Sequence, residues 1–303
     1  MITDDAPGAK PLPGEDGQDL MGAGGPRAGL AVSVVSFAPD LPALGQTLAS
    51  LALAVTVARR EGLLRHCRLF LVDNGPGPGW ASRLRPLLAR FEALAPGCEA
   101  RLLSGHGNLG FGRGHNLAPR QQGDTFRLVL NPDVLLARNA IQEAILFLAS
   151  HPEVGLLSPY AEDREGGRQY LCKNYPALFD LFLRGLAPAR VRGWFAARLA
   201  AYERREGCGP EEPGFDAPIV SGCFLFCRQE LWEALGGFDE GYFMYFEDFD
   251  FSLRSGRVTK LAYAPKVRIV HAGGHAARKG LRHVVMFARS GWRFFNRHGW
   301  RLW

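Results

Sequence analysis

The chain has 303 residues, of which 47% are hydrophobic and 22% are charged. This length allows one large α/β domain or two small ones, and the composition is that of a folded protein rather than a disordered or fibrous one. The longest apolar runs, around residues 31–38 and 48–58, are shorter than the roughly 18 to 20 residues that a membrane-spanning helix needs. The sequence therefore predicts a folded chain that does not cross a bilayer.

The formal net charge is +6, and the excess of basic residues lies at the end of the chain. Residues 278–303 contain seven arginines or lysines and no acid, so 29 basic and 30 acidic residues remain elsewhere. A basic field over the whole chain, typical of many nucleic-acid binders, is absent, and we expect no nucleic-acid partner. A local basic patch of this kind suits phosphates or an anionic membrane.

Six cysteines are scattered along the chain, and no C-x-x-C pair suggests zinc or a redox couple. The first residues lack the basic and apolar regions of a secretory signal. We therefore expect reduced, buried thiols in a cytoplasmic protein.

The first half of the chain predicts strands that alternate with helices. Residues 1–29 contain seven glycines and four prolines, which predicts a disordered leader. Strands are expected at 31–37, 68–72, 99–103 and 126–130, with helices through 44–55, at 80–94 and at 139–150. This alternation predicts right-handed β-α-β crossovers and a parallel sheet.

The second half is less regular. It predicts a helix over 175–205, a strand at 217–227, helices near 229–235 and from 247, and strands at 259–263 and 266–271. In parallel sheets, ligands bind beyond the carboxyl ends of the strands. The segments there are 73–74, 105–116 and 131–133.

The segment Gly105–Gly110 matches the letters G-x-G-x-x-G and follows a strand. A dinucleotide-binding loop of this type belongs to the first strand-helix turn, whereas this one lies in the third unit. A phosphate-tolerant loop or a plain turn is therefore favoured over NAD or FAD binding.

Asp133 follows a strand, and the rigid Pro132 makes it project over the end of the sheet. One carboxylate there suits Mg²⁺ or Mn²⁺ when substrate phosphates supply further ligands. Capping of the next helix by Asp133 is an equally good interpretation of the residues alone. His271 ends the last expected strand and is either structural or a second metal ligand.

Glu247, Asp248 and Asp250 place three carboxylates within four residues, among aromatic side chains, at the start of a helix. Stabilisation by the helix dipole is the structural interpretation. The aromatic setting favours a functional one, because a dry cleft raises the pKa of a carboxyl group toward that of a general base.

Together these features resemble the family 2 glycosyltransferases, and within them the rhamnosyltransferase-like branch that builds bacterial surface polysaccharides. The resemblance spans residues 31–298 and rests on the segments 72–75, 108–116, 130–133, 221–222, 236–240 and 243–250. It implies a GT-A fold, in which a Rossmann-like nucleotide-binding half with a mostly parallel central sheet joins an acceptor half. We place these halves at 30–135 and 136–277, followed by a basic C-terminal helix at 278–303.

The resemblance also implies roles for single residues. Those implied to bind the nucleotide-sugar are Asp73, Asn108, Gly110, His115, Asn131 and Asp133. Asp248 is implied to be the general base and Glu247 its catalytic neighbour, while Gly222 and Asp250 contact the acceptor. Asp133 and His271 are implied to hold a divalent metal, Mg²⁺ or Mn²⁺. Asn131 stands where many family members have a further aspartate.

The activity implied is inverting, metal-dependent transfer of a sugar, in this branch rhamnose, from a nucleotide-diphosphate donor such as dTDP-rhamnose. The acceptor is a saccharide or a lipid-linked sugar. Transfer of another hexose and a catalytically silent carbohydrate-binding or scaffold relative stay open. A sugar nucleotidyltransferase is disfavoured, because residues 37–40 lack a basic, glycine-rich phosphate loop.

The basic C-terminal helix is expected to be amphipathic. Arginines recur every four residues at 289, 293, 297 and 301, and the opposite side carries Val284, Phe287, Ala288, Trp292 and Phe295. One interpretation is a helix docked on the core with a solvated basic face. The other is peripheral contact with the inner face of the plasma membrane, beside a lipid-linked acceptor.

Overall fold

The structure is a computed structural model that describes residues 28–273 and 280–303. The expected disordered leader lies outside the described residues, except that Ala28 and Gly29 already belong to the first strand. Residues 278 and 279 of the expected basic helix also lie outside them.

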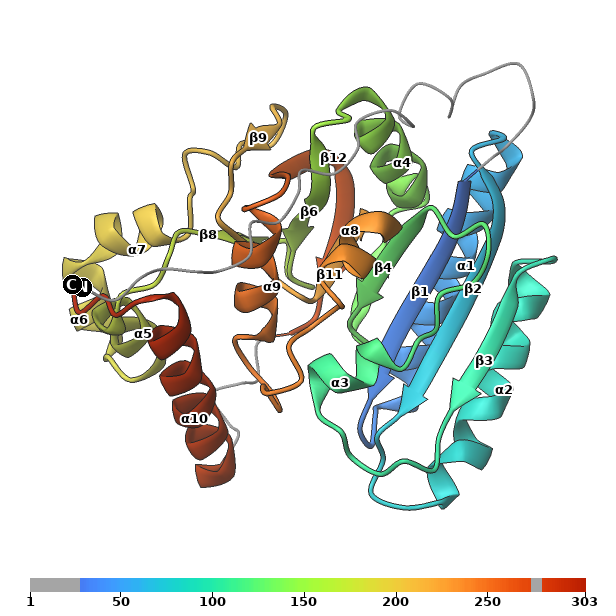
Figure 1. Cartoon of the computed structure of the whole chain (residues 1–303), viewed down its shortest axis with the longest axis horizontal. Coiled ribbons are helices and arrows are strands. Elements are labelled where there is room, and N and C mark those ends of the chain that lie inside the picture. The colour runs from blue at the N-terminus through green and yellow to red at the C-terminus, as the bar shows by residue number, and fades with distance from the viewer. Residues whose placement is uncertain (1–27, 274–279) are drawn as a thin grey trace.

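Four parallel strands form the first part of a ten-stranded sheet, in the order β3-β2-β1-β4 (Figure 1). They are β1 (Ala28–Ser36), β2 (Leu64–Asp73), β3 (Glu99–Leu103) and β4 (Phe126–Leu130). Strands β1 and β4 are buried almost throughout, because helices cover both faces of this part of the sheet. The predicted parallel sheet is confirmed here.

The sheet continues from β4 in the order β11-β6-β12-β5. These strands are β11 (Phe224–Arg228), β6 (Val154–Glu162), β12 (Lys260–His271) and β5 (Val134–Leu136). Strand β11 is antiparallel to both neighbours, β12 is parallel to β6, and β5 is antiparallel to β12. The expected boundary between the two halves falls inside β5, so a single sheet runs through both.

Four short strands lie at the margins. Strand β7 (Arg168–Gln169) pairs with β6, β9 (Gly214–Phe215) pairs with β12, and β8 (Cys172–Lys173) pairs with β10 (Ile219–Val220) in a separate sheet. The expected strand at 217–227 is therefore two strands, β10 and β11. They separate at Ser221–Cys223, where the Gly222 N–H donates to a side chain instead of a neighbouring strand.

The two strands expected at 259–263 and 266–271 are one strand, β12. Its pairing with β6 shifts register between Ala264 and Arg268, around Pro265. Proline donates no backbone hydrogen bond, so the ladder is interrupted there without ending the strand. Strand β6 lies where the sequence pattern predicts no strand.

One face of the sheet carries α1 (Leu41–Arg60), α2 (Gly79–Leu94) and α4 (Ala140–Ser150). Asp40 caps α1 by accepting a hydrogen bond from the Ala43 N–H at 2.9 Å. By length and composition α1 is long and apolar enough to cross a membrane, which the apolar runs in the sequence did not indicate. Its positions Leu44, Leu51 and Val55 are buried in the core, as in a core helix.

The other face carries α3 (Phe111–Asn116), α8 (Gln229–Ala234) and α9 (Glu247–Ser255). Trp232 from α8 and Phe251 from α9 pack with Phe238 over Val129 and Leu225 of the sheet. This second core fixes α9 against the centre of the sheet.

A third group of helices lies at the end of the molecule opposite α2 (Figure 1). It comprises α5 (Leu178–Gly185), α6 (Ala189–Trp194), α7 (Ala196–Tyr202) and α10 (Leu281–His298). The single helix expected over 175–205 is thus three helices. Pro188 is the N-cap of α6, and the residue before a proline disfavours the helical conformation, so α5 ends beforehand.

Helix α10 docks through Phe294 and Phe295, which are buried with Tyr242 and Phe246. The arginines of the expected basic side lie at the surface of α10, but the expected apolar side is only partly buried. Arg293 and Arg297 bind the Asp239 carboxylate. Trp292, by contrast, is 64% exposed.

Candidate active site

The carboxyl ends of β1 and β2 support the first expected site residues. Asp73 and Asn74 are buried, and Asp73 Oδ1 accepts a hydrogen bond from the Gly75 N–H at 2.9 Å. The Asn74 N–H donates to Ser36 O, and Asn74 Nδ2 donates to Gly110 O at 2.7 Å. Asn74 therefore joins the end of β2 to the loop that precedes α3.

That loop requires glycine at position 110. Asn108 Oδ1 accepts a hydrogen bond from the Gly110 N–H at 3.0 Å, and the next residue, Phe111, donates its N–H to Phe243 O at 2.9 Å. Gly110 has φ +83°, and a Cβ there would lie 2.0 Å from Phe243 O. The G-x-G-x-x-G letters thus encode a tight approach of two backbones at the start of α3.

His115 takes a different place from the one expected. Its side chain is fully buried, its Nδ1 lies 2.8 Å from Ser33 Oγ, and its ring packs on Phe111. Burial lowers the pKa of His115 to about 3, so the ring is neutral. His115 is therefore packed between α3 and β1, and its ring is not exposed at the carboxyl ends of the strands, where the nucleotide was expected.

Asp133 and His271 meet at the ends of β5 and β12. Asp133 Oδ1 lies 3.7 Å from His271 Nε2. The other ring nitrogen, Nδ1, lies 2.9 Å from Gln169 Oε1, and Gln169 Nε2 donates to His271 O. Gln169 therefore orients the ring so that Nε2 points at the carboxylate, an arrangement typical of metal-binding histidines.

These two residues fit a divalent cation. Asp133 Oδ1 is buried without a hydrogen-bond partner, which is costly unless something else satisfies it. Burial lowers the pKa of His271, so the ring stays neutral, as a metal ligand must. Residues 28–273 and 280–303 contain no group of three or more histidine, cysteine or acidic ligands, so two protein ligands are what this part of the chain offers. The alternative of helix capping is not what the structure shows, because Asn139 is the N-cap of α4.

The segment Ser221–Cys223 links Asp133 to Asp248. Asn131 donates its N–H to Cys223 O at 2.9 Å, and the Gly222 N–H donates to Asp248 Oδ2 at 2.9 Å. Burial raises the pKa of the Cys223 thiol to about 12, and the charges of Asp133 and Asp248 both add to this rise. The two carboxylates therefore flank one short segment. The Gly222 N–H donates to Asp248, so it is not free to contact an acceptor as expected.

Glu247 and Asp248 form a pair of neighbouring carboxyl groups with different surroundings. Burial and the Asp248 charge raise the pKa of Glu247 to about 8, and Glu247 Oε2 is buried without a hydrogen-bond partner. Burial also raises the pKa of Asp248, but the N–H groups of Gly222 and Phe249 stabilise its carboxylate. The backbone donors therefore favour the charged form of Asp248, and Glu247 has no such donors on its Oε2.

The residues before this pair adopt an unusual backbone conformation. Tyr245 has φ +72° and Phe246 has φ +65°, a region that non-glycine residues rarely occupy. The Phe246 ring lies 5.0 Å from that of Phe287 and 5.2 Å from that of Phe294, both on α10. Packing against α10 therefore holds the strained entry to the carboxylate pair.

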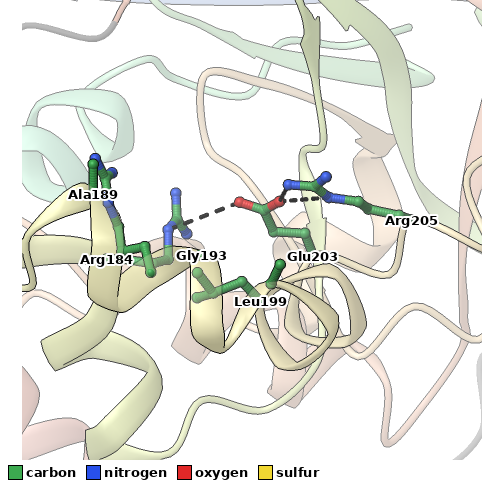
Figure 2. A pocket seen from close by; sticks show the side chains of 8 residues that line it. Arg184, Ala189, Gly193, Leu199, Glu203 and Arg205 are labelled. Atoms are coloured by element: carbon green, nitrogen blue, oxygen red, sulfur yellow. Dashed lines mark hydrogen bonds and ion pairs between the residues drawn. The ribbon is translucent and has the colours of Figure 1, made fainter.

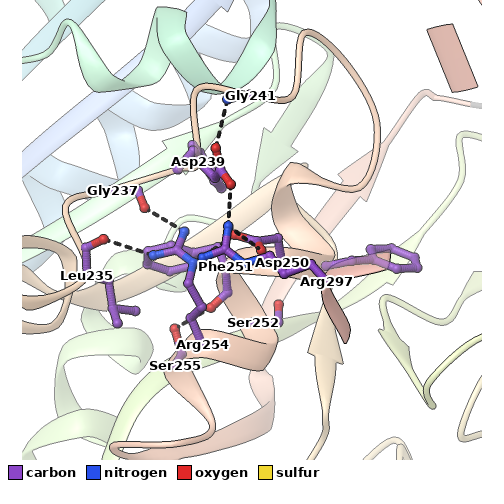
Figure 3. A network of polar contacts seen from close by, with 12 residues as sticks. Leu235, Gly237, Asp239, Gly241, Asp250, Phe251, Ser252, Arg254, Ser255 and Arg297 are labelled. Atoms are coloured by element: carbon purple, nitrogen blue, oxygen red, sulfur yellow. Dashed lines mark hydrogen bonds and ion pairs between the residues drawn. The ribbon is translucent and has the colours of Figure 1, made fainter. Parts of the chain in front are cut away.

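Asp250 serves a buried ion-pair network (Figure 3). It is fully buried, accepts a hydrogen bond from Arg254 Nε at 2.7 Å, and has its other oxygen 2.8 Å from His298 Nε2 on α10. Arg254 also donates to the carbonyls of Leu235 and Gly237. Asp250 thus joins α9, α10 and the turn at 236–240, and its carboxylate is not free to meet an acceptor as expected.

Sequence reasoning missed some residues that complete the site. Gln169 orients His271 from a two-residue strand, and nothing in its local sequence marks it. Tyr245 and Phe246 adopt the left-handed conformation without a glycine, which is the residue that usually indicates it in a sequence.

The sheet and the helices on its two faces form a GT-A fold, and comparisons with known proteins bear this out. No protein-family model matches the chain. It is 32% identical over 292 residues to N-acetylglucosaminyl-diphospho-decaprenol L-rhamnosyltransferase of Mycobacterium tuberculosis, across 89% of this chain and 86% of that protein. It is 25% identical over 187 residues to rhamnosyltransferase WbbL of Escherichia coli, across 57% of this chain and 64% of that protein.

Solved structures share the fold at low sequence identity. Mannosyltransferase PcManGT from Pyrobaculum calidifontis, in complex with GDP-Man and Mn²⁺, has a TM-score of 0.54 and 18% identity across 89% of this chain. GalNAc-T7 with UDP, GalNAc and Mn²⁺ has a TM-score of 0.55 and 14% identity across 80% of this chain. The chain spans 65% and 42% of these two proteins, respectively.

The fold and the relatives define a glycosyltransferase of the GT-A class that acts in glycan synthesis. The chain belongs to the rhamnosyltransferase-like branch of the family 2 glycosyltransferases.

Proposed function

We propose that the chain transfers L-rhamnose from dTDP-L-rhamnose to the sugar of a lipid-linked acceptor, with inversion at the anomeric carbon. The observation that carries this proposal is the arrangement of Asp133 and Asp248 on either side of Ser221–Cys223. Inversion needs a base on the acceptor side and a cation on the diphosphate side, and this arrangement supplies a group for each.

Asp248 is the general base in this proposal. Its carboxylate takes the proton of the acceptor hydroxyl as that oxygen bonds to the anomeric carbon, while the bond from that carbon to the diphosphate oxygen breaks. The N–H groups of Gly222 and Phe249 favour the ionised form of Asp248, and they hold its two oxygens in fixed positions. Glu247, with its pKa raised to about 8, is protonated at neutral pH and available as a hydrogen-bond donor.

Asp133 and His271 are the residues that would hold Mg²⁺ or Mn²⁺. A bound divalent ion stabilises the negative charge of a departing diphosphate. The support is the buried, unpaired Asp133 Oδ1 and the orientation of His271 by Gln169. The two structural neighbours that contain nucleotide or nucleotide-sugar together with Mn²⁺ agree with this choice of cofactor.

The nucleotide is proposed to lie over the ends of β1 and β2. Asp73 and the loop from Asn108 to Gly110 line this end of the sheet, and Asn131 sits beside the Cys223 carbonyl. Phe37, which follows β1, is 54% exposed and offers a face for a base to stack on. Rhamnose and the lipid-linked acceptor are inferred from the names of the mycobacterial and Escherichia coli relatives.

A lipid-linked acceptor brings the enzyme to a membrane, and we place it at the cytoplasmic face. Large apolar side chains exposed on α5, α6, α10 and the chain end support this: Leu186, Trp194, Val284, Val285, Trp292, Leu302 and Trp303. These elements lie together at one end of the molecule (Figure 1). Arginines lie among them, as in interfacial segments that bind anionic lipid.

Calorimetric titration of the purified protein with dTDP, UDP and GDP, each with Mn²⁺ and with chelator, tests the donor site. We expect dTDP to bind in Mn²⁺ and to lose most of its affinity in chelator. Asp133→Ala should weaken metal-dependent binding by about tenfold or more, because one of two protein ligands is lost.

Glu165→Ala, which removes an exposed acid from the β6–β7 turn, is the matched control and should bind dTDP normally. If the protein preferred UDP or GDP, the assignment of dTDP-rhamnose as the donor would be wrong. Normal binding of donor and metal by Asp133→Ala would show that the metal assignment is wrong.

A further inference from the structure

A cavity of about 500 Å³ lies between α5, α6 and α7, away from the carboxyl ends of the first strands (Figure 2). Three arginines, Arg184, Arg192 and Arg205, line it together with a single carboxylate, that of Glu203. The cavity therefore carries an excess of two positive charges. Neither the donor site nor the carboxylate pair uses it.

Glu203 arranges these arginines. Arg205 donates to Glu203 Oε2 from Nη2 at 2.7 Å and from Nε at 3.0 Å, and Arg184 Nε lies 4.0 Å from Glu203 Oε1. Figure 2 shows the Glu203 carboxylate lying between the two guanidinium groups. Arg192 makes no ion pair within the part of the chain that the structure describes. Guanidinium groups gathered around one cavity match the oxygens of a phosphate or diphosphate.

Two buried side chains, Tyr202 and Lys173, lie next to the cavity. Tyr202, on α7, has its ring 5.5 Å from the Arg184 guanidinium and 5.8 Å from Lys173 Nζ. Its hydroxyl is buried without a hydrogen-bond partner. Lys173, on β8, pairs with Ile219 of β10, and β10 leads directly to Gly222, which holds Asp248.

Electrostatics agrees with this placement. Burial raises the pKa of Tyr202 to about 12, and the charges of both Arg184 and Asp248 act on it. Burial lowers the pKa of Lys173 to about 8; the Arg184 charge adds to this fall, and the Glu203 charge opposes it. A charge of the cavity, that of Arg184, and the charge of the base thus both act on Tyr202.

Apolar side chains stand next to the cavity. Leu186, which follows α5, is 76% exposed, and Trp194, which ends α6, is 81% exposed. Each lies within two residues of a lining arginine in the sequence. A ligand with an anionic group in the cavity would therefore find apolar surface for an attached hydrocarbon chain.

We infer that this cavity binds the diphosphate of the lipid-linked acceptor, with Arg184, Arg192 and Arg205 on its oxygens and Leu186 and Trp194 beside its lipid chain. This inference rests on the proposed function, since it places the acceptor whose sugar hydroxyl meets Asp248. It gives α5–α7 the task of fixing the acceptor at a set distance from the base.

Farnesyl diphosphate is the probe, titrated in chelator so that metal-dependent binding at the donor site does not contribute. We expect the wild-type protein to bind it, to bind inorganic pyrophosphate more weakly, and not to bind farnesol. Arg192→Ala should lower the affinity for farnesyl diphosphate about tenfold, as expected when a charge-assisted contact is removed. Arg190→Ala removes an equally exposed arginine of α6 that does not line the cavity, and should leave this affinity unchanged.

Other outcomes overturn the inference. Equal losses in Arg192→Ala and Arg190→Ala would reveal general attraction to a basic surface, and displacement of farnesyl diphosphate by dTDP would put it in the donor site. Binding to phosphatidylglycerol vesicles that falls in Arg192→Ala, without any change for farnesyl diphosphate, would assign the cavity to lipid headgroups. The metal-dependent dTDP titration is independent of all these, so failure of the proposed function is seen separately.

Discussion

Asp248 and Glu247 are adjacent in the sequence, and the protein treats their charges differently. Two backbone N–H groups stabilise the Asp248 carboxylate, while Glu247 keeps one oxygen unpaired in a buried position. Burial raises the pKa of both. Because a carboxyl group with a raised pKa takes up its proton at higher pH, the base form of Asp248 is lost as the pH falls through that raised value.

Asp248→Asn should leave dTDP binding nearly intact and lower kcat by about 10² or more, as expected when a general base is removed. The wild-type kcat should also decline toward acid pH, and this decline should vanish from the residual activity of the variant. Both are measured from initial rates of rhamnosyl transfer over a pH series.

Asp216→Asn is a suitable control for that substitution. Asp216 has φ +59°, which asparagine tolerates, and it lies outside the site. Its kcat should equal that of the wild type. Full transfer by Asp248→Asn would require another residue as the base.

The segment Phe243–Phe246 is the element on which the site depends, and two helices hold it. The Phe111 N–H at the start of α3 donates to Phe243 O, and Ser290 Oγ on α10 donates to Met244 O. Tyr245 OH lies 2.8 Å from His283 Nδ1, also on α10. The basic C-terminal helix is therefore a support of the active site as well as a candidate membrane contact.

Gly110→Ala should misplace this segment, and Gly107→Ala is its matched control. Both glycines have positive φ, so both substitutions cost about 1 kcal/mol in backbone strain. A Cβ at Gly110 also meets Phe243 O at 2.0 Å, whereas a Cβ at Gly107 meets nothing within 4 Å. We expect Gly110→Ala alone to lose a further ~1–3 kcal/mol of unfolding free energy, because overpacking a well-packed contact costs about that much. This variant should also lose much of its kcat.

Denaturant unfolding and kcat, measured on both variants, check this expectation. Similar losses in the two would mean that the contact between α3 and Phe243 is unimportant.

At the scale of the whole molecule, the core helices are covered, whereas α5, α6, α10 and the chain end leave apolar side chains uncovered. Val284, Val285 and Trp292 are 56%, 59% and 64% exposed on α10. Isolated apolar residues on a surface need no explanation, but a group of them at one end of a molecule marks an interaction site.

We expect the protein to sediment with vesicles that contain anionic lipid at low salt, and less at high salt, because salt screens the arginines. The double variant Val284→Ser/Trp292→Ser should bind these vesicles about tenfold more weakly or worse, since each buried apolar side chain contributes roughly 1.5–3 kcal/mol. Leu53→Ser, on the half-exposed side of α1, should bind like the wild type. Failure of the unaltered protein to sediment at low salt would remove the membrane proposal.

The parallel part of the sheet, the family and the segments that carry the candidate site can be predicted from the sequence alone. The signal is local: buried strands of β-branched and aliphatic residues are followed by polar turns, as at Asp73 and Asp133. Such local patterns can be recognised in the sequence without knowing the fold. All six cysteines are free and buried, as the absence of paired spacing predicted.

The tertiary structure decided which residues of those segments face the site. In the sequence, His115 and Asp250 both look free to bind a ligand. In the structure, His115 contacts Ser33, which is 82 residues away along the chain. Asp250 binds Arg254 and also His298, which is 48 residues away. The arginines at 293 and 297 likewise bind Asp239, across separations of 54 and 58 residues. Charge pairing and burial depend on partners far away along the chain, and only folding brings such partners into contact.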